Sequence, residues 1–234
     1  MLWNDTLIWS RGLGFIAGAS LFWLQYFDLK DYLHPEPRRW LLLSYFLGAV
    51  SAGLGLALYV LIEALGGPGE PAGGRAQILL YCFLVVGPVE EGAKFLIARI
   101  FIFRSLEFDE AVDGLIYSSA VSIGFASMES LIYFPILEWP DHLVRTLTAP
   151  LTHSLFSSLW GFGAGVAFFR SGSRTSRILW QLLPLAGAAL IHGLYDYVLL
   201  AMNGTFVASG LALVLWMFLI GHARRLVQSR PYIK

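Results

Sequence analysis

Residues 40–63 read WLLLSYFLGAVSAGLGLALYVLIE, and the only charged side chain in this run is the final Glu63. A run of about 20 apolar residues is long enough to cross the hydrocarbon core of a bilayer as one helix. Six further stretches have the same character, at residues 9–27, 76–98, 114–137, 146–169, 178–201 and 206–224. The sequence therefore predicts an all-α, polytopic membrane protein of about seven transmembrane helices.

The composition supports this prediction and excludes several other classes of protein. The chain is 57% hydrophobic and 14% charged, whereas soluble domains contain about 25% charged residues. Its 16 basic and 16 acidic residues cancel, so no overall field favours a nucleic acid partner. A single cysteine, Cys82, excludes a disulfide framework and a cysteine-rich metal site. Because the connections between the runs are short, residues 1–234 are expected to form one multi-pass domain of the cell membrane.

The basic residues of the predicted connections lie mainly on one side of the membrane. With seven spans, twelve Lys and Arg residues fall in the connections and tail on one side, and only Arg75 and Arg145 fall on the other. Connections rich in Lys and Arg stay in the cytoplasm. This asymmetry predicts an external N-terminus and a cytoplasmic C-terminus.

Several ionisable residues fall inside the predicted spans, where a charge costs roughly 2.5–3.5 kcal/mol on insertion scales. They are Glu90, Glu91, Lys94, Glu129, His153, His192 and Asp196. Pairs such as Glu90 and Lys94, or His192 and Asp196, are four residues apart and therefore share a helix face. Small residues hold membrane helices together without such a cost, so we expect these seven to converge on a functional site. The preceding Gly87-Pro88 is expected to interrupt the third span beside a polar cavity.

The charges of this set do not balance, because four carboxylates face one lysine, Lys94. Crowded carboxylates at low dielectric need shared protons or a cation. Shared protons would give a carboxylate that activates water as a general base. A divalent cation such as zinc would instead use Glu129, His153 and His192, which lie at similar predicted depths. Both alternatives lead to hydrolysis, and the residues alone leave them open.

Four ordered blocks of the sequence resemble the motifs of one family, and the second of them comprises two segments, 113–117 and 124–129. They are VEEGAK (89–94), DGLIY (113–117), GFASME (124–129), RTLTAPLTH (145–153) and HGLYD (192–196). Together they resemble the PrsW family of intramembrane proteases, which belongs to a wider superfamily with the type II CAAX prenyl proteases.

This resemblance implies a role for each residue of the set. Glu90 or Glu91 would be the base that activates water, and Lys94 its electrostatic partner. His153, His192 and Asp196 would be supporting polar groups. Glu129 stands where the CAAX enzymes have histidine, which makes a metal more plausible.

The main expectation is therefore an intramembrane endopeptidase with a glutamate-activated water, and the metal-dependent form of the same reaction is its alternative. The resemblance also implies the substrate class: a membrane protein, of the anti-sigma-factor type, cut in or near a transmembrane segment on its extracytoplasmic side. An ion-coupled transporter and a non-catalytic scaffold are the two other candidate classes. The sequence shows no inverted repeat of the transporter kind, and the intact double glutamate with Lys94 disfavours a scaffold.

Overall fold

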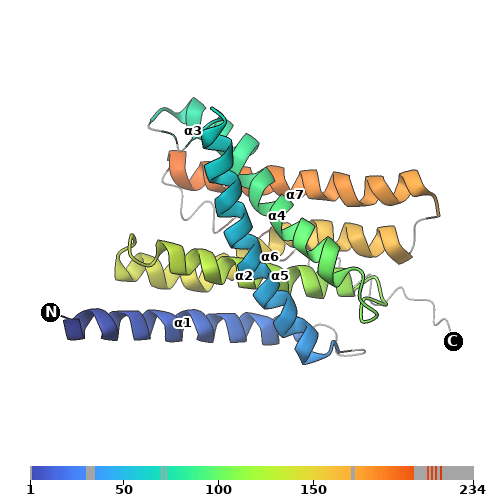
Figure 1. The fold of residues 1–234 in the computed structure, drawn as a ribbon, viewed down its shortest axis with the longest axis horizontal. Helices are drawn as coiled ribbons and strands as arrows, with labels where there is room; N and C mark the ends of the chain where they lie inside the picture. The colour runs from blue at the N-terminus through green and yellow to red at the C-terminus, as the bar shows by residue number, and fades with distance from the viewer. Residues whose placement is uncertain are drawn as a thin grey trace.

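A computed structural model of the chain describes residues 2–29, 35–69, 71, 73–169 and 172–202, together with residues 210, 212, 214 and 217. The described residues are all-α (Figure 1). The helices are α1 (Leu2–Asp28), α2 (Arg38–Ala64), α3 (Arg75–Tyr81), α4 (Gly87–Ile97), α5 (Asp113–Tyr133), α6 (Trp139–Phe169) and α7 (Arg174–Met202). π-Helical turns at Cys82–Val86 and Ala98–Ile102 join α3 to α4 and extend α4, so Arg75–Ile102 is one continuous helical rod.

Six of the predicted apolar runs coincide with these helical rods. The all-α class is confirmed, although α5 ends at Tyr133 rather than at residue 137. Three of the described helices, α2, α5 and α7, are long and apolar enough to cross a bilayer. The seventh predicted run, 206–224, lies outside the described residues except at four single positions.

The expected interruption at Gly87-Pro88 is wrong, because the helix continues through it. Proline lacks an N–H and crowds the preceding turn, and the π-helical turn Cys82–Val86 directly before it accommodates this defect. Gly87 also lets α4 approach α7 closely, since a Cβ there would lie 2.1 Å from the carbonyl oxygen of Ala189. The pair Gly87-Pro88 thus sets the packing of α4 without breaking it.

Helix α5 lies at the centre of the described bundle. It packs against α1, α2 and α6, while α7 packs against α4 and α6. In the view of Figure 1, α1, α5 and α7 lie nearly horizontal, and α2 and α4 run obliquely across them. This arrangement brings α4, α5, α6 and α7 around one interior region.

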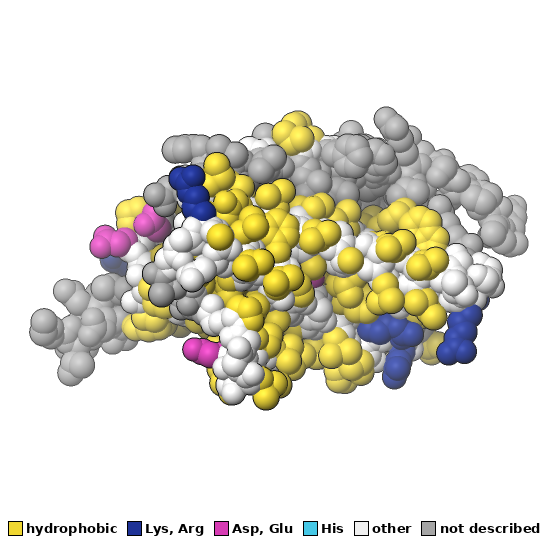
Figure 2. Space-filling model, turned by 90° about the horizontal axis from the view of Figure 1, so that it is seen from above, with side chains coloured by type: hydrophobic (Ala, Val, Ile, Leu, Met, Phe, Trp, Pro, Cys, Tyr) yellow, Lys and Arg dark blue, Asp and Glu magenta, His cyan; other side chains and the backbone are white. Residues whose placement is uncertain are grey.

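The outer surface is apolar, as expected for a helix bundle in lipid. Hydrophobic side chains predominate among the described residues on the face shown in Figure 2, and most of the charged ones lie at its margin. On α2, for example, Phe46, Val50 and Val60 are 62%, 60% and 61% exposed. Such faces are stable only where the surroundings are themselves apolar.

The contact between α2 and α5 depends on glycines, and this gives a first prediction. A Cβ at Gly48 would lie 1.9 Å from the carbonyl oxygen of Val121, whereas a Cβ at Gly53 on the same helix meets no described atom within 4 Å. Gly48→Ala should lower the free energy of unfolding in detergent by about 1–3 kcal/mol, because the helices must separate. Gly53→Ala, the same chemical change, should be neutral or stabilising by up to about 1 kcal/mol. Equal effects of the two substitutions would contradict this packing.

Candidate active site

All seven ionisable residues predicted from the sequence meet in the interior of the bundle. Each has a charged or hydrogen-bonding atom within 4.0 Å of another member of the set. Helix α4 carries Glu90, Glu91 and Lys94, and α5 carries Glu129. Helix α6 carries His153, and α7 carries His192 and Asp196. Four helices therefore contribute to one polar cluster.

Glu91 is the most completely bonded member of this cluster. Its Oε1 accepts from Lys94 Nζ at 2.6 Å and from His192 Nδ1 at 2.9 Å. Its Oε2 accepts from Ser157 Oγ at 2.8 Å and from Trp160 Nε1 at 2.9 Å. A carboxylate has about four lone-pair positions, so these donors leave Glu91 no capacity to take a proton from water.

The hydrogen bonds assign a tautomer to each histidine. As a neutral imidazole, the form that binds a metal, His192 donates from Nδ1 to Glu91, and its Nε2 then carries a lone pair. Lys94 Nζ has donors only, and it lies 2.9 Å from His153 Nδ1, so that nitrogen is the acceptor. The remaining nitrogen of His153, Nε2, then bears the hydrogen and lies 3.0 Å from Glu129 Oε2.

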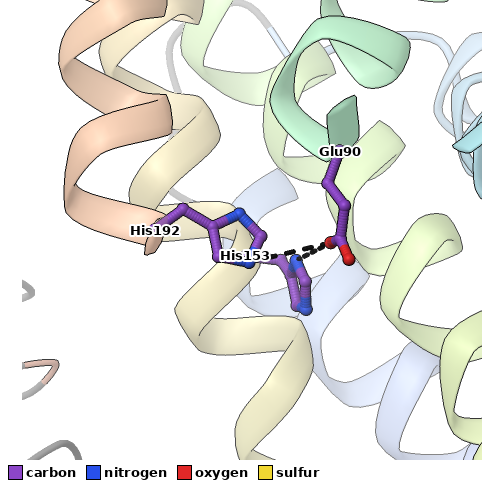
Figure 3. A group of neighbouring side chains, drawn as sticks. All are labelled: Glu90, His153 and His192. Carbon is purple, nitrogen blue, oxygen red and sulfur yellow. Dashed lines mark ion pairs between the residues drawn. The ribbon is translucent and has the colours of Figure 1, made fainter. Parts of the chain in front are cut away.

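Three possible ligand atoms lie near one another, although the lone pair of His153 Nδ1 is taken by Lys94. Glu90 Oε2 lies 3.7 Å from His192 Nε2 and 4.0 Å from His153 Nδ1. Figure 3 shows both imidazole rings directed at the Glu90 carboxylate. Ligand atoms of the three residues lie within 4.8 Å of one another, and all three side chains are buried. Glu90 Oε2 has no hydrogen-bond partner among the described residues.

Such a buried group of acceptors needs a positive charge, and its chemistry fits a metal ion. Zinc is bound in proteins by histidine nitrogen and carboxylate oxygen, which are the donors present here. The expected ligand set was Glu129, His153 and His192; the geometry groups the two histidines with Glu90 instead. One nitrogen, His153 Nδ1, faces both this group and the Lys94 ammonium.

Glu129 occupies a neighbouring position and has a different partner. Its Oε1 lies 2.6 Å from Arg145 Nη2, and the Arg145 guanidinium lies 4.3 Å from the centre of the Tyr133 ring. Its Oε2 contacts His153 on the side away from Lys94. Carboxylates placed behind a histidine in this way fix the tautomer and orientation of a metal ligand.

Sequence reasoning missed several partners of this cluster. Trp160 lies two helical turns after His153 on α6, a spacing that places both on one face, but a lone tryptophan in an apolar run gives no signal of its own. Arg145 precedes the fifth predicted run and looks like an interfacial cation. Tyr59 donates to Glu90 Oε1 at 2.9 Å, and nothing in the α2 run distinguishes it from a lipid-facing aromatic residue.

Comparison with known proteins identifies the family. The family model described as PrsW family intramembrane metalloprotease matches residues 36–222. The chain belongs to the PrsW family of intramembrane metalloproteases. The Protease PrsW of Bacillus subtilis (strain 168) is 33% identical over 91% of this chain and 93% of that protein. The Protease PrsW of Geobacillus kaustophilus (strain HTA426) is 31% identical over 94% and 92% of the two chains. No solved structure matches the chain.

Family membership confirms that the chain is a multi-pass membrane enzyme that hydrolyses protein. It rejects the transporter and scaffold alternatives. It also corrects the main mechanistic expectation: the metalloprotease family and the buried group of Glu90, His153 and His192 support the metal-dependent alternative better than a glutamate-activated water.

The buried pair of Glu91 and Lys94 gives a second prediction. Both side chains are 0% exposed, so Lys94→Met leaves a carboxylate without its ammonium partner at low dielectric. This substitution should lower the free energy of unfolding by about 3–5 kcal/mol, and Glu91→Gln in the same chain should restore part of the loss. The exposed pair of Arg39 and Glu107 is the control, with side chains 77% and 30% exposed.

Arg39→Met should cost at most about 1 kcal/mol, because water and salt screen an exposed pair. Unfolding in detergent measures all three variants. A loss for Lys94→Met no larger than that for Arg39→Met would show that Glu91 does not depend on this lysine.

Proposed function

We propose that Glu90, His153 and His192 bind one divalent metal ion of the zinc type, and that this protease hydrolyses a peptide bond in or beside a transmembrane segment of a membrane-protein substrate. The observation that carries the proposal is the convergence of three atoms from three helices: Glu90 Oε2, His153 Nδ1 and His192 Nε2. Among the described residues, no hydrogen-bond donor reaches Glu90 Oε2. When bound, the ion would polarise the scissile carbonyl and activate water near neutral pH.

The neighbouring residues hold the ligands in place. Glu91 accepts from His192 Nδ1 and so keeps the lone pair of Nε2 directed at Glu90. Glu129, itself paired with Arg145, lies with its Oε2 3.0 Å from His153 Nε2. Lys94 pairs with Glu91, and its hydrogen bond to His153 Nδ1 must be given up before that nitrogen can bind the ion. Partners of this kind set the orientation and basicity of metal-binding histidines.

Asp196 is the carboxylate best placed to accept the proton of the attacking water. Glu91 has its lone pairs occupied, Glu129 is paired with Arg145, and Glu90 faces both histidines. Asp196 Oδ2 lies 3.4 Å from His192 Nε2, and its side chain is 22% exposed, against 8% for Glu90. A general base must reach both water and the reacting group, which this position allows.

The location of the cluster supports cleavage toward the outer face. We propose one transmembrane protease domain over residues 1–234 with seven spans, an external N-terminus and a cytoplasmic C-terminus. In that topology Ala64 and Tyr133 end α2 and α5 at the outer surface. Glu129 lies four residues before Tyr133, or about 6 Å along the helix. A substrate of the anti-sigma-factor type would be cut on its extracytoplasmic side.

Removal of single ligands tests the metal site. Wild-type protein purified without chelator should contain roughly one zinc per chain, and exhaustive chelation should stop cleavage of a reconstituted membrane-protein substrate. His153→Ala, His192→Ala and Glu90→Gln should each lower metal content and cleavage by at least about tenfold, because each removes a ligand atom. Elemental analysis of the monodisperse fraction measures the metal content.

His142→Ala is the matched control for these variants. His142 lies on the same helix as His153 and is 1% exposed, but its ring packs against Phe134. This variant should keep wild-type metal content. Cleavage that survives chelation with less than about a tenth of an equivalent of metal would rule out the metal-dependent mechanism.

Reporter fusions test the topology. A reporter fused after residue 234 should be cytoplasmic, and one inserted in the loop between Gly66 and Gly74 should be external, because basic connections stay inside. Alkaline phosphatase and green fluorescent protein activities distinguish the two sides. Both reporters on one side would mean that the number of spans between them is even.

A further inference from the structure

The third residue of the proposed metal group, Glu90, is held by a helix that contributes no predicted site residue. Tyr59 lies on α2, and its hydroxyl donates to Glu90 Oε1 at 2.9 Å. The other oxygen of the same carboxylate, Oε2, is the one that faces His153 and His192. The two oxygens of Glu90 therefore have separate partners.

Glu90 needs such a partner more than the histidines do. The terminal torsion of a glutamate is broad, so the two carboxylate oxygens exchange places readily unless one is fixed. The histidines are oriented by ionised groups, His192 by Glu91 and His153 by Lys94 and Glu129. Tyr59 is the group that bonds Glu90 from outside its own helix in the described structure.

We infer that Tyr59 is a positioning residue for the metal site: its hydroxyl fixes Glu90 Oε1 and so presents Oε2 to the ion. This inference rests on the proposed metal site. It assigns α2 a role in the chemistry, because a partly buried phenol from that helix orients a ligand on α4. If Tyr59 contributed only by packing, removal of its hydroxyl would leave the metal site unchanged.

The test compares two tyrosines of the same helix. Tyr59→Phe removes the hydroxyl that bonds Glu90, and Tyr45→Phe removes one that lies 3.5 Å from Ser20 Oγ, away from the site. Apo protein is titrated with zinc against a chromophoric chelator. Tyr59→Phe should weaken zinc binding by about 10-fold or more, the usual effect of losing an outer-shell partner. Tyr45→Phe should leave the affinity unchanged, and the thermal stability of both apo variants should match the wild type within a few degrees.

A double-mutant cycle separates positioning from a structural role. In the Glu90→Gln background, Tyr59→Phe should cause no further loss of zinc affinity, because Tyr59 acts through the Glu90 carboxylate. In reconstituted enzyme at saturating zinc, Tyr59→Phe should lower kcat and leave KM within twofold.

Three results would overturn the inference. Equal zinc affinities of the wild type and Tyr59→Phe would remove the role of Tyr59 and leave the metal site intact. The same loss in the Glu90→Gln background as in the wild type would show that Tyr59 acts through the fold. Wild-type protein that binds no metal would overturn the proposed metal site together with this role.

Discussion

The carboxylate of Glu91 is a full charge with 0% side-chain exposure inside an apolar bundle, and the organisation of the site depends on how that charge is solvated. Protein donors replace water: Lys94, His192, Ser157 and Trp160, from α4, α6 and α7. At low dielectric each missing donor would cost several kcal/mol. The three helices can therefore associate stably only in the register that delivers these donors together.

This register also determines which atoms are left for chemistry. Because His192 gives its Nδ1 hydrogen to Glu91, its neutral ring presents the Nε2 lone pair toward Glu90. The Nδ1 of His153 also lies beside Glu90, but its lone pair accepts from Lys94, which a metal ion would have to displace. Close packing makes the geometry possible, since Gly193 brings α7 against the π-helical turn, where a Cβ would lie 2.6 Å from the carbonyl oxygen of Cys82. The solvation of one structural charge thus orients the ligands of the neighbouring metal group.

The sequence predicted the helices well because apolar length decides them, and it predicted the seven polar residues because charge inside a span is costly. It did not predict which carboxylate joins the histidines. Depth along separate helices places Glu129 beside His153, and the structure confirms that contact, but the rotation of each helix selects Glu90 for the ligand group. Tyr59 was missed because a tyrosine, unlike a charged residue, costs little to place in a span. Nothing in the sequence therefore distinguishes it from the other nine tyrosines.

The charge balance of the assembled cluster also favours a bound metal ion. Glu90, Glu91, Glu129 and Asp196 supply four negative charges when ionised. Lys94 and Arg145 supply two positive charges. The sequence did not place Arg145 in the cluster, but in the structure its guanidinium lies 2.6 Å from Glu129. With both histidines neutral, the form in which they can bind a metal, a surplus of two negative charges remains beside Glu90 and Asp196. One divalent cation would cancel that surplus, whereas sharing a single proton would leave one charge uncompensated at low dielectric. The same count explains why two neutral histidines, rather than two more carboxylates, complete the ligand group.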